Sequence, residues 1–318
     1  MSDDVESLQE LTRQRAAKAR ERHALLAAEL YRAPRGLLSD SERSLMTGMI
    51  AGLIASIAAA IDNRANDKAL VQRLREGGVL EDPDLIAAAY HRMLEFERER
   101  QRASEDMVTA LAAGQELEVA HAVGEYLVWR GRRRDAYGNP VLDVDALPNS
   151  AVERLHWAVA AALRTEDSTR EEVLETATLG VLAGLRDVPE TAPVRAARLL
   201  LECGAVNAEL LGPLIEMGEI VLFEALLARL CSIPILLIRR ALFEPGGETL
   251  AIVAKAAALD QATLVTMLAA GRRVRPRDGD CPAALTLFDR LDPATARRAL
   301  RAIARHPDFQ EAIRRLEG

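Results

Sequence analysis

The sequence predicts an all-α protein, with an N-terminal helical hairpin or bundle followed by an irregular α-solenoid of short antiparallel helix pairs. Residues of high helix propensity, chiefly Ala, Leu, Arg and Glu, are abundant, and aromatic residues make up only 3% of the chain. Runs rich in Val, Ile, Thr and Tyr, which would mark strands, are missing. In the C-terminal half, apolar residues recur at helical spacing between frequent Gly and Pro breaks, as in the segment 220–230.

Residues 1–75 are expected to form the helical hairpin. The highly charged segment 4–32 is typical of one long helix, and Pro34 and Gly36 end it. Ser39 then begins a second helix, with Glu42 three residues further on. This spacing is that of a capping box, in which each residue bonds the backbone N–H of the other.

The second helix carries a ridge of small side chains and no charged residue from 45 to 61. A spacing of four places its small residues on one helical face, where another helix can approach closely. An isolated hairpin cannot bury this surface within itself. We therefore predict that residues 1–75 are the dimerisation module of a homodimer, with an interface at Gly48, Gly52, Ser56 and Ala60.

The same stretch is the part of the chain to compare with a membrane span. A helix over 45–61 would be about 26 Å long, which is less than the roughly 30 Å of a bilayer core. Much of it is Ala and Gly, which add little to the free energy of insertion. We therefore expect a buried helix and no membrane insertion, and the acidic start of the chain lacks the pattern of a signal peptide.

Charge and cysteine usage indicate the compartment and the class of partner. The net charge of −7 argues against a general nucleic-acid binder, because phosphates are held by Lys and Arg. The three cysteines Cys203, Cys231 and Cys281 are odd in number, far apart and without metal-ligand spacing. A reducing, cytoplasmic location fits them best.

Residues 76–135 are expected to be linking helices, and 136–149 a loop. Helix starts are predicted at Asn66-Asp67, Asp82-Pro83 and Ser104, and helix ends at Gly77-Gly78 and Gly114. A further helix should cover 115–131. The segment 132–149 has turn residues and no hydrophobic period, so the main domain boundary is predicted there.

Residues 150–318 are expected to form the solenoid. Two capping boxes are predicted, Ser150 with Glu153 and Ser168 with Glu171. Helices of roughly 10–17 residues are then broken at Pro189, Gly204, Gly218, Pro234, Gly246-Gly247, Gly271, Pro293 and Pro307. Such short helices cannot each form a core, so they must stack on their neighbours.

The run GEIVLFEALLARLCSIPILLIRRALFEPGGETL and the helix after it, together 218–270, resemble the conserved stretch of a bacterial HEAT-like helical-repeat family classed as a domain of unknown function. The matching positions are Phe223, Glu224, Ala225, Leu226, Leu227, Pro234, Ile238 and Gly246-Gly247. The segment 64–86 is similar to an earlier repeat of the same family, whereas Cys231-Ser232-Ile233 departs from its Ser-Gly turn. The resemblance covers roughly 64–290 with gaps, and it implies a HEAT-like fold without implying any chemistry.

Two Glu-x-x-His motifs are the sharpest candidate for chemistry. Glu118 with His121, and Glu153 with His156, each place a carboxylate and an imidazole on one helical face. Two such pairs and two further Glu residues can build a di-iron site. Glu95, Glu97 or Glu99 could add a ligand, but they lie in a run of alternating charge that is typical of a solvated face. We expect surface coincidence here, and keep a metal-binding protein as an alternative.

Phosphotransfer is a second alternative, because dimeric helical hairpins present the reactive His of some bacterial signalling proteins. His23 lies on the first long helix. Ala24 follows it, where an acidic residue often stands, and the chain has no Gly-rich nucleotide-binding pattern. A hairpin that only dimerises is the simpler interpretation.

Two basic clusters are candidates for an acidic partner or a nucleic-acid backbone. The first is Arg130, Arg132, Arg133 and Arg134, and the second is Arg272, Arg273, Arg275 and Arg277. Cations at a helix C-terminus are already favoured by the helix dipole, which accounts for the first cluster. The second follows Gly271 in a predicted loop. A solvated surface is the expected role of both.

No GxSxG, Walker, GxGxxG or HExxH motif occurs in the chain, and we predict neither an enzymatic activity nor a cofactor. A helical solenoid binds through an extended surface and distributed side chains, so it needs no compact motif. The sequence therefore favours a non-enzymatic protein–protein interaction scaffold, with bacterial signalling as its setting.

Overall fold

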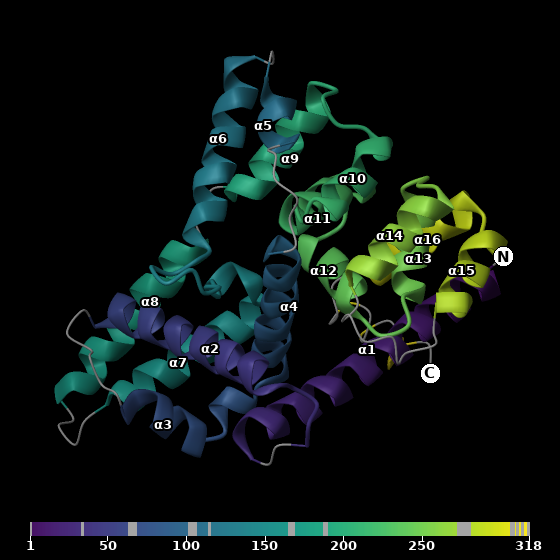
Figure 1. Ribbon diagram of the computed structural model, residues 1–318. Coiled ribbons are helices and arrows are strands. Elements are labelled where there is room, and N and C mark those ends of the chain that lie inside the picture. The colour runs from purple at the N-terminus through teal and green to yellow at the C-terminus, as the bar shows by residue number, and fades with distance from the viewer. Residues whose placement is uncertain are drawn as a thin grey trace. The chain divides into compact units, whose positions relative to one another are not determined.

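The computed structural model describes residues 2–32, 35–62, 69–100, 107–113, 116–164, 169–186, 190–271 and 281–305, with the single residues 309, 312, 315 and 316. Within these ranges the chain forms sixteen α-helices and three short 3-10 helices (Figure 1). No strand occurs among them, and the only β-type pairing is an isolated antiparallel bridge between Arg134 and Pro140. The predicted all-α class is confirmed.

The described chain divides into two compact units built from segments that alternate along the sequence. Unit 1 consists of Met1–Ala19, Arg98–Tyr126 and Ala192–Gly318, and unit 2 of Arg20–Glu97 and Leu127–Thr191. Three helices, α1 (Ser2–Tyr31), α4 (Pro83–Arg100) and α6 (Leu117–Arg132), contribute residues to both units. The linear boundaries expected from the sequence, at 75, 135 and 149, stay a prediction.

Unit 2 is a helical layer built around α2 (Asp40–Ile61). This helix packs against α7 (Asn149–Leu163) and α8 (Thr169–Arg186), which also pack against each other (Figure 1). Unit 2 also contains α3 (Ala69–Glu76), which packs on α7, and the 3-10 helices η1 (Val79–Glu81) and η2 (Val144–Ala146), together with its parts of α1, α4 and α6.

Unit 1 is organised around α13 (Glu248–Ala256), whose residues are buried with the exception of Lys255. It packs against α12 (Ile235–Phe243), α14 (Gln261–Ala270), α15 (Cys281–Arg290) and α16 (Pro293–Ile303). A second group consists of α9 (Ala192–Glu202), η3 (Ala208–Leu210), α10 (Leu211–Glu216) and α11 (Ile220–Cys231). α11 packs against α9, α10 and α12, and the short helix α5 (Met107–Ala112) completes the unit.

Local capping signals located some helix starts correctly and misplaced one. The Ser39–Glu42 capping box is present at α2, with both reciprocal hydrogen bonds. The predicted box at Ser150 is wrong, because α7 begins at Asn149 after Pro148, and Ser150 is therefore inside the helix. The predicted starts at Asn66-Asp67, Ser104 and Ser168 lie outside the described residues.

The turn between α12 and α13 requires glycine for both conformation and space. Gly246 and Gly247 have φ of 103° and 79°, which is the left-handed region that L side chains rarely adopt. A Cβ on Gly247 would lie 2.2 Å from Cδ2 of Leu268, on α14. This turn lets α13 enter the centre of unit 1 with α14 packed directly over its start.

A buried polar cluster surrounds that turn. Arg15, in the part of α1 that belongs to unit 1, forms an ion pair with Glu248 at the start of α13. Thr249 donates a hydrogen bond of 2.9 Å from Oγ1 to the Glu244 carboxylate. Burial raises the pKa of the Glu244 carboxyl from 4.5 to about 7, since a charged carboxylate is poorly solvated there.

This pKa predicts a loss of stability as pH rises through neutrality. Between pH 4.5 and 7 the unfolded chain has already released the Glu244 proton while the folded chain keeps it, so the free energy of unfolding falls as pH increases. In Glu244→Gln this contribution disappears. The decrease in unfolding free energy from pH 5 to pH 8, measured by urea denaturation, should be smaller in the variant by about 2–3 kcal/mol.

The matched control is Glu209→Gln, which changes an exposed carboxylate of the same unit. Its pH dependence should equal that of the unmodified chain. Equal pH dependence of all three proteins would mean that Glu244 ionises normally in the folded state.

Candidate interaction surface

α2 has two faces of different chemistry, and the bulky one points into unit 2. Its large apolar side chains repeat at a spacing of three or four and are buried. α7 and α8 pack against this helix within the same unit. The buried residues are Met46, Met49, Ile50, Leu53, Ile54, Ile57, Ala58 and Ile61.

The opposite face of α2 is exposed and made of small residues. Gly48, Gly52, Ser56 and Ala60, the four positions predicted from the sequence, are all exposed. A Cβ on Gly48 or Gly52 would meet no atom within 4 Å. The four residues therefore line one open, smooth stripe on which another helix could lie at short distance.

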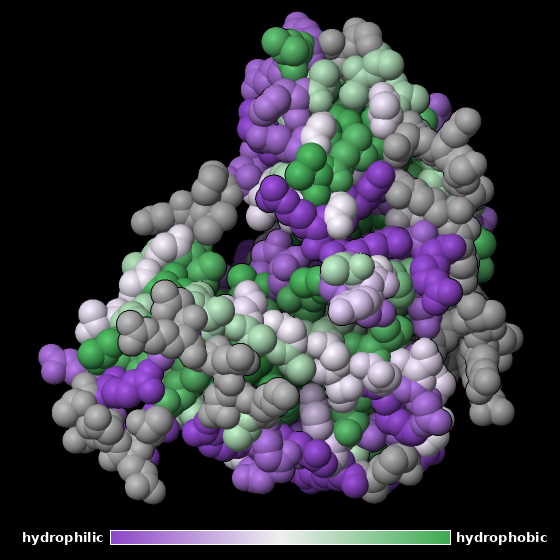
Figure 2. Space-filling model, turned by 60° about the vertical axis from the view of Figure 1, so that its left-hand side comes forward, coloured by the Kyte–Doolittle hydropathy of each residue, from purple (hydrophilic) through white to green (hydrophobic). Residues whose placement is uncertain are grey.

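The neighbouring helices add larger apolar side chains to the exposed surface of unit 2. In α8, Leu174, Thr178 and Leu182 are buried, while Val173 and Leu179 are 66% and 54% exposed. On α7, Trp157 is 38% exposed. Figure 2 turns this side of the protein forward and shows a broad pale area of intermediate hydropathy there.

α2 is also long and apolar enough to cross a membrane. The pair α11 and α12, bent at 118°, meets the same criterion if the two helices are taken as one span. The core helix of a globular protein has the same length and composition. Since the Ile, Leu and Met side chains of α2 face the interior of unit 2, insertion would require this packing to break.

The first basic cluster is only partly a surface feature. Arg132 and Arg134 are exposed, and the Arg134 guanidinium carbon lies 5.3 Å from the centre of the Phe96 ring. Arg133 is only 5% exposed and adds no charge to the surface. The second cluster, Arg272, Arg273, Arg275 and Arg277, lies outside the described residues.

Arg133, which follows α6, forms a buried ionic network with Arg92 and Glu95 of α4. Its Nη2 donates to Oε2 of Glu95 at 2.9 Å, and Nη1 of Arg92 lies 3.5 Å from the same oxygen. Arg92 and Glu95 are both 1% exposed. The solvated face predicted for Glu95 is therefore wrong, because the segment after α6 folds over this part of α4.

Arg92 also holds the backbone of that segment in place. Its Nε donates to the Val141 carbonyl at 3.2 Å, and its Nη2 donates to the Arg133 carbonyl at 3.0 Å. The irregular stretch between α6 and α7 is thus held at its start and near its middle by one buried guanidinium. The sequence showed only a charged pair at i, i+3 within an apolar run, which is a weak signal for such a network.

The two Glu-x-x-His motifs are placed in different units. Glu118 and His121 are exposed on the unit 1 part of α6, where Nδ1 of His121 lies 3.7 Å from Oε1 of Glu125. His156 on α7 is 2% exposed, and its Nδ1 lies 2.8 Å from the Val152 carbonyl. Glu153 is half-buried. Among the described residues, no group of three or more His, Cys, Asp or Glu side chains could hold a metal ion.

His23 is placed where phosphotransfer would be difficult. It is 9% exposed, and its ring packs edge-on against that of His91, with 5.8 Å between ring centres. A phosphoryl-accepting imidazole must be reached by a donor protein. The burial of His23 therefore argues against this alternative.

Comparison with known proteins identifies a family but no characterised relative. A model of the family described as "Uncharacterised protein conserved in bacteria (DUF2336)" matches residues 99–301. No curated protein and no solved structure gives a significant match. The match covers more than half of the chain and includes the segment 218–270.

The buried network predicts that two adjacent arginines differ sharply in their effect on stability. Arg133→Met removes a charge that pairs with buried Glu95, and it should lower the free energy of unfolding by about 3 kcal/mol. Arg132→Met, at an exposed position, should change it by less than about 0.5 kcal/mol. Urea unfolding followed by circular dichroism measures both. Two equally small effects would show that the network does not hold the segment in place.

Proposed function

We propose that this chain, which belongs to the DUF2336 family of bacterial proteins, is a non-enzymatic protein–protein interaction scaffold that forms a homodimer through the exposed face of α2. The observation that carries the proposal is the open stripe of Gly48, Gly52, Ser56 and Ala60 on a helix whose other face is fully packed.

The chemistry of the stripe favours another helix as its partner. Small side chains let two helix backbones approach closely, and no charged residue between 45 and 61 would have to be desolvated. In a two-fold arrangement the same stripe on the second copy supplies a matching surface. A second copy of this chain therefore satisfies the requirement without any other component.

The proposed interface extends onto α8, which packs beside α2. At 1.5 Å per residue the two helices are roughly 33 and 27 Å long. With a packing width of about 10 Å, they offer about 600 Å² per protomer. Stable interfaces bury about 600–1,000 Å² per partner, so this area is at the lower end of their range. Exposed Val173 and Leu179 would add apolar area to the contact.

For the second part of the chain we propose an irregular HEAT-like arrangement that binds a protein partner in the cytoplasm. Support comes from the succession of short helices α9 to α16, in which α11 and α12, α12 and α13, and α13 and α14 pack as neighbours. A protein is favoured over nucleic acid because the net charge is −7 and Arg133 is buried. Bacterial signalling is the setting that a dimeric scaffold would suit.

The proposed dimer is tested by placing larger side chains on the stripe without disturbing the fold. In the double variant Gly48→Gln with Gly52→Gln, the new side chains project into open space and have higher helix propensity than Gly. We expect the unmodified chain to be a dimer in multi-angle light scattering. We expect the variant to be a monomer with unchanged helix content.

The matched control is Gly131→Gln, because Gly131 is also an exposed helical glycine with no atom within 4 Å of a Cβ. It should remain a dimer. A monomeric unmodified chain, or a double variant that stays dimeric, would refute the proposed interface. Recovery of the unmodified chain only in detergent would instead favour a membrane role for α2.

A further inference from the structure

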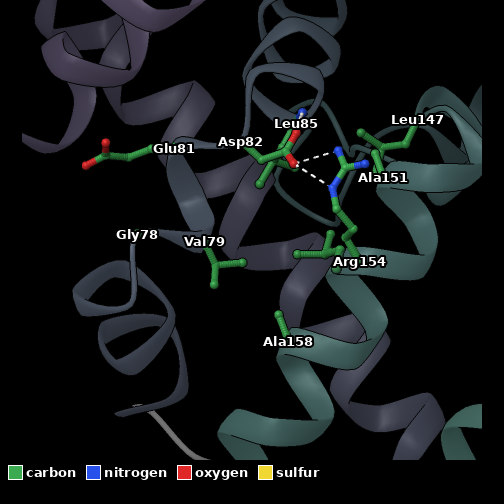
Figure 3. A pocket seen from close by; sticks show the side chains of 10 residues that line it. Gly78, Val79, Glu81, Asp82, Leu85, Leu147, Ala151, Arg154 and Ala158 are labelled. Atoms are coloured by element: carbon green, nitrogen blue, oxygen red, sulfur yellow. Dashed lines mark hydrogen bonds and ion pairs between the residues drawn. The ribbon is translucent and has the colours of Figure 1, made fainter.

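Several exposed arginines of this acidic protein have a carboxylate beside them. In unit 2, Nη2 of Arg154 donates to Oδ2 of Asp82 at 2.7 Å (Figure 3). In unit 1, Nη1 of Arg13 lies 2.6 Å from Oε2 of Glu10. Such pairing is expected in a chain with 48 acidic and 41 basic side chains, because carboxylates are in excess. The helix α16 of unit 1 departs from this pattern.

α16 carries a row of arginines on the face that points away from the core. The segment 293–305 contains four arginines and no carboxylate. Arg297, Arg301 and Arg305 are exposed and four residues apart, which places them on one helical face at intervals of about 6 Å. We call these three residues the arginine row. The opposite face is buried, and α16 packs against α13. The buried residues of α16 are Thr295, Ala296, Ala299, Leu300 and Ala302.

The described part of the chain leaves the charge of this row uncompensated. Arg297 and Arg301 form no ion pair with any described residue. Nε of Arg297 donates to the Ala256 carbonyl at 3.1 Å, which orients the side chain and leaves its charge in place. Arg298 lies off the row, and its Nη2 donates to Oγ1 of Thr295 at 2.9 Å.

The stability of α16 itself does not account for the arginine row. Like charges at a spacing of four destabilise a helix. The helix dipole favours cations in the last turn, where Arg301 lies, but not in the first half of the helix, where Arg297 lies. A row of unpaired guanidinium groups on a protein of net charge −7 therefore requires another explanation, and a negatively charged partner supplies one.

We propose that the exposed face of α16 binds an acidic helix of a partner protein, with carboxylates at a spacing of four that pair with Arg297 and Arg301. Arg305 continues the same face. The inference rests on the proposed function, since it names the chemistry of the protein that the second part of the chain would bind. It does not depend on the dimer.

The geometry favours a helix because the two charge patterns then repeat at the same interval. Glutamates at a spacing of four on a helix are also about 6 Å apart, so two helices lying side by side match charge for charge. A guanidinium group can bind a carboxylate through two parallel hydrogen bonds, which adds geometric specificity to the charge.

A nucleic acid fits this surface less well. The exposed carboxylates of Asp289 and Asp292, just before α16, limit the basic area to the length of one helix. A phosphate backbone would extend past the row and meet these carboxylates, whereas a short acidic helix would not.

The test measures the binding of labelled peptides to the full chain by fluorescence anisotropy at neutral pH and low salt. The probe is an Ala/Gln peptide of about 18 residues, long enough to form a helix, with three glutamates at a spacing of four. Two control peptides have the same glutamates distributed around the helix, or glutamine in their place. We expect the probe to bind at least tenfold more tightly than either control, and its affinity to fall as salt is added.

Two variants with the same change in net charge locate the binding. Arg301→Glu alters an exposed side chain without an ion pair, so the fold should be kept, and it should weaken the probe at least tenfold. A peptide with lysine in place of the central glutamate should bind this variant more tightly than the unmodified chain. Arg132→Glu, at an exposed position of unit 2, should leave the affinity for the probe within twofold. Circular dichroism and unfolding midpoints check that both variants are folded.

Equal affinity for the three peptides, or no binding of the probe, would overturn the proposal. Equal weakening by Arg301→Glu and Arg132→Glu would do the same, because net charge alone would then explain the binding. A DNA duplex that binds more tightly than the probe and loses affinity in Arg301→Glu would replace the acidic helix by a nucleic acid. Light scattering tests the proposed dimer separately, so that function and this inference can fail independently.

Discussion

The guanidinium of Arg92 is the interaction on which the arrangement of unit 2 depends. It is buried with Glu95 and Arg133, and it binds the carbonyls of Arg133 and Val141. This anchors the first half of the irregular segment between α6 and α7. α7 in turn packs against α2. A buried charge that satisfies backbone carbonyls thus holds part of the segment that leads to the helix supporting α2.

In unit 1 the corresponding constraint is the entry of α13 into the core. The Gly246-Gly247 turn allows this helix to be surrounded by α12, α14, α15 and α16. Its first residue, Glu248, is nevertheless charged and buried, and Arg15 of α1 compensates it. The N-terminal helix is therefore joined to the C-terminal bundle by an ion pair in a poorly solvated place, beside a carboxyl of Glu244 whose pKa is raised to about 7.

The proposed scaffold function would require no compact motif. α2 devotes its bulky side chains to the interior and its small ones to solvent, a division that unit 2 does not need for its own packing. This feature depends on shape and on the absence of bulk, and such properties leave little trace in a search for catalytic residues.

The sequence by itself determined the features that arise from interactions between near neighbours. The helical class, the capping box at Ser39 and the small-residue face of α2 follow from propensity, capping and helical period, and the family resemblance touches the segment matched by DUF2336. The tertiary structure alone decided which polar residues are inside. Nothing local distinguishes Arg133 from Arg132, or marks Glu95 and His156 as buried. Their environments depend on which distant segments cover them, and that is set by long-range packing.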